Sequence, residues 1–234
     1  FKERLKIFFN KKNKSLDDWY EFMSALLGGF PEIKTFGNRL FHLLQNLSYD
    51  ILIDNQSLSF GVLQVQNKIP VIEIVHHPIT KDYKYDIKFS KGIVQKISKW
   101  RWFSFLSMQK KVAPFMKTIS TPSINSKNDI VKDFNVSKKK IMVIPNGIDH
   151  INFSPKKHIN RNPEQLITTA SADVPLKGLD FTLKAIHSIK KDFPKIRLVI
   201  IGAPRPGGHT ERLIQKLNLE ANIVYKTNLT KEDI

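Results

Sequence analysis

Short apolar runs alternate with segments of helical spacing along most of the chain. Runs typical of buried strands lie at 50–54, 70–75, 118–121, 141–144, 166–170, 196–201 and 222–225. Segments with helical spacing lie at 36–47, 58–67, 93–116, 123–134, 178–193 and 210–217, and the segment 93–116 is long enough for one helix or two. Ser123 is placed to cap the helix that it begins. This alternation predicts an α/β fold with parallel sheets covered by helices on both faces.

A polar stretch without periodicity divides the pattern in two. It runs from Pro145-Asn146-Gly147 to Pro163, and the alternation of strands and helices restarts after it. We therefore expect two Rossmann-like, doubly wound domains at 1–155 and 164–234, joined by a linker at 156–163. The length of 234 residues corresponds to about one and a half domains, so both domains are expected to be incomplete. The basic and then Gly-rich first thirty residues are not assigned to any element.

Composition narrows the class of protein without naming a function. A charged fraction of 25% beside 41% hydrophobic residues is typical of a soluble globular protein and excludes disorder, collagen-like repeats and coiled coil as the main structure. The net charge is +17, but seven of the 38 basic residues are arginine. Because base readout relies on arginine, a lysine-rich solvated surface is favoured over nucleic-acid binding.

The absence of cysteine and of long apolar runs bears on location. A chain with no cysteine has no disulfides and no thiolate metal site, and it suits a reducing compartment. No run of about 18 apolar residues occurs in the sequence, and we expect a cytoplasmic protein. The basic, aromatic stretch 91–117 fits either a domain helix or contact with the inner face of an anionic membrane. The domain helix is favoured, and peripheral membrane contact stays an alternative.

Three loops are candidates for chemistry because ligands of open parallel sheets bind beyond the carboxyl ends of the strands. His76-His77 follows the strand at 70–75, Lys177-Gly178 follows the strand at 166–170, and a Gly- and Pro-rich loop at 202–208 follows the strand at 196–201.

Lys177 is the most informative of these residues. It stands at the start of a helix, where the positive end of the dipole disfavours a cation. A bound phosphate between the lysine and the helix amides would explain it, although an exposed lysine is also common. Gly202 would let the backbone approach a ligand, or the loop is simply a turn. Arg205 can pair with a phosphate or lie in solvent.

The histidines have less specific interpretations. His76 and His77 can serve in acid-base chemistry or hydrogen bonding because imidazole titrates near neutral pH. A single histidine after a strand is more often a cap or a packed neighbour. We expect no metal site, since no third ligand has suitable spacing, and the lack of Gly-x-Gly-x-x-Gly weakens a dehydrogenase interpretation.

Several segments together resemble glycosyltransferase family 4, the retaining enzymes of GT-B fold. The similarity covers about Asp50 to the end of the chain. The segments are Asp54-Asn55-Gln56-Ser57, His76-His77-Pro78-Ile79, Thr121-Pro-Ser123 followed by Ile141-Met-Val-Ile-Pro-Asn-Gly-Ile-Asp149, Pro175-Leu-Lys177-Gly178-Leu179 and Arg197-Leu-Val-Ile-Ile-Gly202. The order and spacing of these segments together are more specific for the family than any single segment.

The resemblance implies a mechanism and a separate role for each domain. The first domain, lacking its first strand, would face the acceptor, and the second would bind a nucleotide-diphosphate sugar. Lys177, with Gly178 and Gly202 near it, would neutralise the diphosphate in place of a metal, so no cofactor is expected. His76 would contact the donor sugar as the catalytic residue, and Leu229 would lie near the nucleotide base.

The chain also departs from the family pattern. Many members have an arginine six residues before the Lys177 position, where this chain has Ser171. Either Arg205 supplies the second positive charge, or the diphosphate is held with less charge. Two other interpretations stay open: another nucleotide-binding Rossmann-like enzyme, and a basic membrane- or nucleic-acid-binding α/β module without catalysis.

Overall fold

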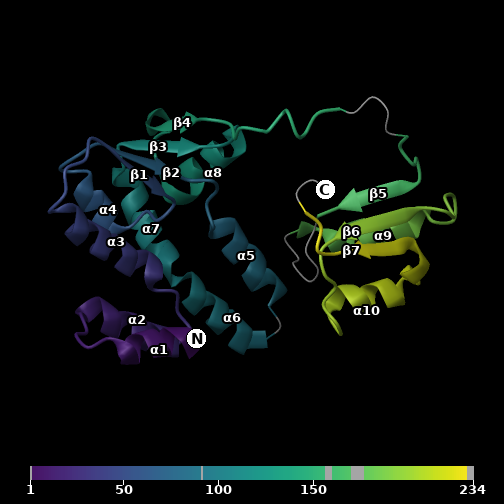
Figure 1. Ribbon diagram of the computed structural model, residues 1–234, viewed down its shortest axis with the longest axis horizontal. Coiled ribbons are helices and arrows are strands. Elements are labelled where there is room, and N and C mark those ends of the chain that lie inside the picture. The colour runs from purple at the N-terminus through teal and green to yellow at the C-terminus, as the bar shows by residue number, and fades with distance from the viewer. Residues whose placement is uncertain (1, 91, 156–159, 170–176, 231–234) are drawn as a thin grey trace. The chain divides into compact units, whose positions relative to one another are not determined.

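The chain folds into two compact units, each built on a parallel sheet (Figure 1). The computed structural model describes residues 2–90, 92–155, 160–169 and 177–230. Contacts divide the chain into units 1–147 and 148–234. The linker predicted at 156–163 includes residues 156–159, which lie outside the described residues, so its bounds stay a prediction.

The sheet of the first unit has its strands in sequence order. Within the described residues it contains β1 (Leu52–Asn55), β2 (Val71–Ile74), β3 (Thr118–Thr121) and β4 (Ile141–Val143), all parallel. Its helices are α1 (Lys2–Asn10), α2 (Leu16–Leu26), α3 (Glu32–Leu44), α4 (Phe60–Val65), α5 (Thr80–Phe89), α6 (Gly92–Trp102), α7 (Leu106–Val112) and α8 (Ile124–Phe134). Short 3₁₀ turns are η1 (Phe103–Phe105), η2 (Ala113–Phe115) and η3 (Lys138–Lys140).

The core of this unit lies between the sheet and the helices α4, α7 and α8. Leu58, Val75, Met116, Ile119 and Ile130 are fully buried there. Figure 1 shows α3, α4 and α7 grouped beneath the sheet.

Helices α3 and α4 approach each other closely through glycine. A Cβ atom placed on Gly61 would overlap the carbonyl oxygen of Gly37, and one on Gly37 would overlap the hydroxyl of Ser59. These two positions therefore admit no side chain at the present helix spacing.

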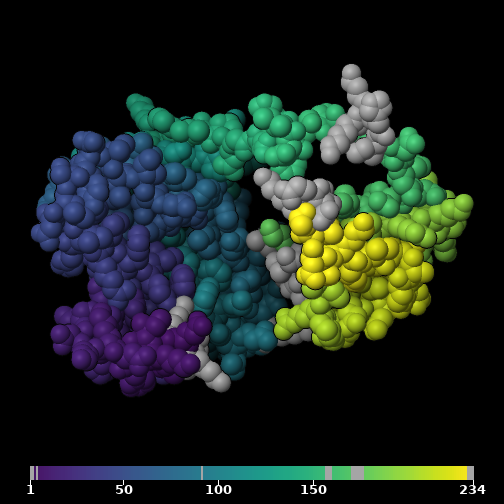
Figure 2. Space-filling model, in the orientation of Figure 1, coloured from purple at the N-terminus to yellow at the C-terminus, as the bar shows by residue number. Residues whose placement is uncertain are grey.

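Residues 2–26 form a helical hairpin, α1 and α2. Ser15 caps α2 in a capping box with Asp18, and Lys11 and Arg39 also bind the Asp18 carboxylate, at 2.6 and 3.0 Å. Phe8 stacks on Phe22, with the ring centroids 4.3 Å apart. In Figure 2 the atoms of the hairpin, coloured purple, lie together in one group.

The second unit repeats the parallel arrangement on a smaller scale. Its described strands β5 (Gln165–Thr168), β6 (Arg197–Ile201) and β7 (Ile223–Lys226) lie in that order. Helices α9 (Leu179–Ile189) and α10 (His209–Lys216) and the turn η5 (Glu220–Asn222) complete it. Leu183 and Ile186 of α9 are buried, and they pack in one cluster with Leu198 and Ile200 of β6.

The predicted α/β class is confirmed, and most elements lie where the pattern predicts them. Strand β3 has the predicted bounds, and Ser123 caps α8 by accepting a hydrogen bond from the backbone of Ser126 at 3.0 Å. The segment 93–116 forms two helices, α6 and α7, separated by the turn η1. Helix α5 lies in the polar stretch for which the pattern predicts no element.

Candidate functional site

His76 lies beyond the carboxyl ends of β1 and β2, where the strand pattern predicts ligand chemistry. The two strands are parallel and in register from Leu52 opposite Val71 to Asn55 opposite Ile74. The loop that follows β1 therefore meets the loop that follows β2. His76 itself is exposed to solvent.

Two side chains from the β1 loop hold His76. Its Nε2 lies 2.8 Å from Oδ1 of Asn55, and its backbone N–H donates to Oε1 of Gln56 at 2.9 Å. Gln56 also donates from Nε2 to the carbonyl of His77 at 2.9 Å. Because an amide oxygen only accepts, the proton of a neutral His76 is on Nε2, which leaves Nδ1 as a free acceptor.

Hydrogen bonds from helix α7 hold the β1 loop in place. Gln56 has the left-handed φ of 68° and Leu58 a φ of 45°. Gln109 of α7 is buried and donates to the carbonyl oxygens of Gln56 at 3.1 Å and Ser57 at 3.3 Å. The position of His76 is thus set by residues from three elements.

The neighbouring histidine has a different environment. Nε2 of His77 lies 3.2 Å from Oδ2 of Asp82, in the first turn of α5. The structure therefore separates the two histidines, with His76 bound to the β1 loop and His77 to α5.

In the second unit, parallel pairing brings the predicted loops to one edge of the sheet. Lys177 and Gly178 lie between β5 and α9, and Gly178 is the N-cap of α9 with a φ of 72°. This left-handed conformation favours glycine. Lys177 is exposed, and it has no hydrogen bond or ion pair with the part of the chain that the structure describes.

The loop after β6 lies beside this position. Gly202 has a φ of 135°, which a side chain would strain, and its N–H donates to Lys226 at 2.8 Å. Arg205 is exposed, and its carbonyl accepts from Gly208, the N-cap of α10, at 2.9 Å. Both helices have glycine as the N-cap, so neither N-cap residue supplies a side-chain hydrogen bond, and the N-terminal end of a helix attracts an anion.

A side-chain pair that the sequence did not predict joins these two helices. Nε2 of His209, the first residue of α10, lies 2.7 Å from Oδ2 of Asp180 in the first turn of α9. Their separation by 29 positions leaves no local sequence signal that could have revealed it.

Of the two remaining residues predicted to bind the sugar donor, the structure describes one. Leu229 is half-buried and follows β7 at the same edge of the sheet as the other loops. Ser171 lies outside the described residues.

The described residues contain no group of three or more His, Asp or Glu side chains arranged to hold a metal ion. They also contain no helix that is both long and apolar enough to span a bilayer.

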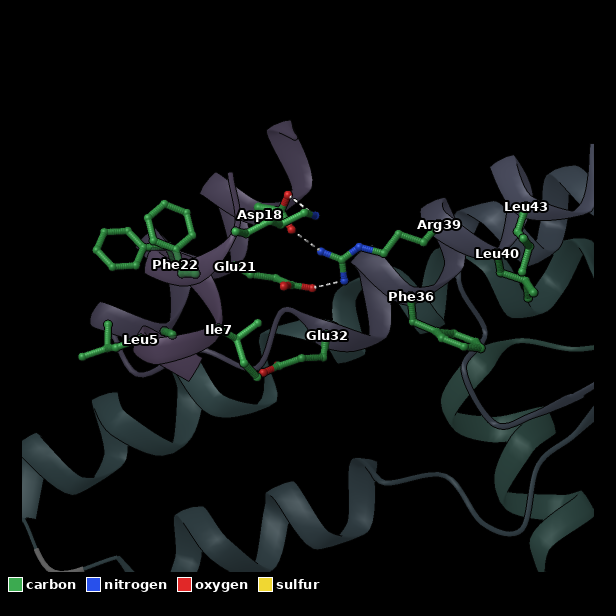
Figure 3. Close-up of a pocket in the computed structure, with 13 residues that line it drawn as sticks. Leu5, Ile7, Asp18, Glu21, Phe22, Glu32, Phe36, Arg39, Leu40 and Leu43 are labelled. Atoms are coloured by element: carbon green, nitrogen blue, oxygen red, sulfur yellow. Dashed lines mark hydrogen bonds and ion pairs between the residues drawn. The ribbon is translucent and has the colours of Figure 1, made fainter. Parts of the chain in front are cut away.

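A cavity that none of the predicted site residues lines lies elsewhere in the first unit. It has a volume of about 760 Å³ and lies among α1, α2 and α3 (Figure 3). Its wall is mainly apolar, with Phe22, Phe36 and Leu40, and carries the ion pair of Arg39 with Glu21 at 2.7 Å. It belongs to the packing between the hairpin and α3, remote in sequence from every predicted site residue.

Comparison with known proteins gives the family. The model of glycosyltransferase family 4 matches residues 20–151, and the model of glycosyl transferases group 1 matches residues 150–234. An MMP alpha-(1->4)-mannosyltransferase of Mycolicibacterium hassiacum is 34% identical over 224 residues. The match covers 94% of this chain and 54% of the relative, so the chain spans about half the length of that protein.

Solved structures agree with this fold at low sequence identity. HepE of Anabaena, solved in complex with UDP, has a TM-score of 0.57 at 13% identity and is matched over 84% of this chain and 52% of its own. The pneumococcal O-GlcNAc transferase GtfA, solved with UDP and GlcNAc, has a TM-score of 0.55 at 18% identity, over 84% of this chain and 37% of its own. The predicted fold class, two Rossmann-like sheets of the GT-B type, is confirmed. Since a single family model covers more than half of its residues, the chain belongs to glycosyltransferase family 4.

Proposed function

We propose that the complete protein is a retaining, metal-independent glycosyltransferase. It takes a sugar from a nucleotide-diphosphate donor and transfers it to a glycan or a lipid-linked acceptor. The observation that carries the proposal is the edge of the β5–β6–β7 sheet, where Lys177, Arg205 and two helix N-termini without side-chain caps gather. The related mannosyltransferase, and the structures solved with UDP, support the same class of reaction.

Lys177 has the role of stabilising the leaving diphosphate. Negative charge grows on the diphosphate as the bond to the sugar breaks, and a fixed cation beside helix amides stabilises that charge in the transition state. The exposed guanidinium of Arg205 is the second cation. These groups supply positive charge without a metal ion.

His76 has the role of contacting the donor sugar. Its proton on Nε2 is engaged by Asn55, at 2.8 Å, so Nδ1 is the nitrogen free to accept a hydrogen bond from a sugar hydroxyl. Such a bond orients the sugar as its ring takes on oxocarbenium character.

An assay of the complete protein tests this proposal. It is incubated with nucleotide-linked mannose, glucose and N-acetylglucosamine in the presence of EDTA, and the anomeric configuration of the product is read by NMR. We expect transfer with retention and no loss on chelation. Inversion of configuration, or a requirement for a divalent cation, would contradict it. Binding of polyanions that falls steeply with salt, without transfer, would instead support the non-catalytic alternative.

We also propose that α6 contacts an anionic membrane surface, as a lipid-linked acceptor would require. No described residue of α6 is buried. Ile93 is 74%, Ile97 45% and Trp100 63% exposed, and their spacing of four and three residues places them on one face of the helix. Lys96 lies beside this face. Exposed apolar side chains flanked by cations bind the interface of an anionic bilayer.

Vesicle sedimentation tests the membrane contact. We expect binding to phosphatidylglycerol-containing vesicles, weak binding to pure phosphatidylcholine, and a clear loss in Ile93→Asp. The matched control is Ile189→Asp, an exposed apolar position at the end of α9. Equal loss in both variants would contradict a role for α6.

A further inference from the structure

Beneath the loop that holds His76 lies a pair of buried carboxyl groups that the proposed mechanism does not use. Asp54 on β1 and Glu73 on β2 are register partners in the sheet. Asp54 is 5% exposed and Glu73 is 0% exposed. Two buried acids side by side are costly unless one of them is neutral.

Asp54 has the contacts of the ionised member. Its Oδ2 accepts hydrogen bonds from the backbone of Ser57 at 2.9 Å, the hydroxyl of Ser57 at 2.7 Å and the backbone of Leu58 at 3.4 Å. These bonds fix the turn after β1, in which Gln56 and Leu58 have left-handed backbone conformations. Oδ1 of Asp54 is left as an available acceptor.

Glu73 has the surroundings of the neutral member. Both its carboxyl oxygens are buried, and neither accepts a hydrogen bond from a donor in the described structure. Burial and the neighbouring charge of Asp54 raise the pKa of Glu73 to about 10. The register partner on its other side is the apolar Ile119 of β3, so Asp54 is the charged group that acts on it. A protonated Glu73 has one O–H to donate.

We propose that Glu73 is a positioning residue, whose neutral carboxyl donates a hydrogen bond to Asp54 and so fixes the turn that presents Asn55 and Gln56 to His76. The chain of contacts runs from Glu73 to Asp54, through the turn at 55–58, to the two side chains that bind His76 at 2.8 and 2.9 Å. The inference rests on the proposed role of His76, but its test needs neither donor nor acceptor.

The test reads the tautomer of His76 by ¹⁵N NMR of its ring, with His76→Ala to assign the signal. Glu73→Gln retains a donor and should keep the Nε2–H tautomer of the native protein. Glu73→Met has a similar volume without a donor and should give a mixture of tautomers. Val71→Ala, at a buried position of the same strand, is the control for lost packing. A native tautomer in Glu73→Met, or the same change in Val71→Ala, would overturn the proposal.

A second measurement applies if Glu73→Met does not fold. A carboxyl group that is neutral when folded and ionised when unfolded takes up a proton on folding. The protection of β2 amides against hydrogen exchange should therefore fall in the native protein as the pH rises from 5 to 9, by up to about tenfold per pH unit. Glu73→Gln should not show this fall. Parallel pH dependences would overturn the proposal. Because both measurements omit the sugar donor, a failed transfer assay does not affect them.

Discussion

Nε2 of His209 lies 2.7 Å from the Asp180 carboxylate, and this pair joins the first turns of α10 and α9. The contact holds the Asp180 side chain beside the point where we propose that a diphosphate binds. Removal of the histidine leaves the carboxylate there without this partner.

We expect His209→Ala to weaken binding of a nucleoside diphosphate by about fivefold, near the 1 kcal/mol typical of an exposed pair. Asp180→Asn in the same background should restore it, since the repelling charge is gone. Isothermal titration calorimetry measures both. The control is His187→Ala, because His187 bonds the carbonyl of Leu217 at the opposite end of α9. Failure of Asp180→Asn to restore binding would contradict the electrostatic explanation.

Lys177→Ala should lower kcat/KM for the nucleotide sugar by about a hundredfold or more in the complete protein, the loss typical of one preorganised group at a developing charge. Lys191→Ala is a matched control, since Lys191 is exposed just beyond the other end of α9. Steady-state kinetics at several salt concentrations separates a local role from general charge. Equal losses in the two variants would mean that only net charge matters.

Asn55→Ala should lower kcat by about tenfold with little change in KM, because an unfixed His76 ring contacts the sugar less often in the productive orientation. Asn67→Ala, at an exposed position after α4, should have no effect. Initial rates over a range of donor concentrations distinguish kcat from KM. A change confined to KM would indicate that Asn55 acts in binding alone.

Gly61→Ala should lower the free energy of unfolding by about 3 kcal/mol, since the new methyl group forces α3 away from α4. Gly147→Ala has open space around its Cβ and should change that free energy by less than about 0.5 kcal/mol. Urea denaturation measures both. Similar values for the two variants would show that the helices separate at little cost.

The hairpin of α1 and α2 should lose stability in acid. The hydrogen bond from Lys11, with those from Ser15, holds the pKa of Asp18 well below its usual range despite its burial. A carboxyl with a lowered folded pKa stabilises the fold above the pKa of the unfolded chain and loses that contribution as the pH falls through the folded value. Amide exchange in α2 should therefore accelerate below about pH 4, and Asp18→Asn should flatten this dependence. An unchanged profile in that variant would assign the effect to other carboxyls.

The sequence predicts the strands of both sheets well, but it predicts poorly which residues hold the site residues in position. Strand β6 (Arg197–Ile201) is apolar from its second residue onward and is bounded by polar turns, so its short apolar run locates it. Helix α5 has the sequence TKDYKYDIKF, in which few apolar residues mark a buried face. For that reason the sequence pattern does not predict this helix.

The site residues also fall into two groups, those that the sequence pattern predicts and those that it does not. His76 and Lys177 follow strands, and that position alone marks them as candidates. Asn55, Gln56 and Gln109 reach His76 or its loop through contacts 20 or more positions apart. Asn55 and Gln56 lie in a segment that contributes to the family resemblance, but no local pattern shows that these neutral amides contact His76. Only the folded arrangement identifies those contacts.

The strand order of the two sheets also affects how the protein is made. In β1-β2-β3-β4 and in β5-β6-β7, each strand pairs with the strand synthesised just before it. Among the described strands, none has to insert between two that have already paired, so β1 to β4, and likewise β5 to β7, can pair in the order in which they leave the ribosome. Loop closure at each of these steps then involves only one strand and its crossover. A stall in synthesis within either run should therefore leave fewer strands, still in native pairing.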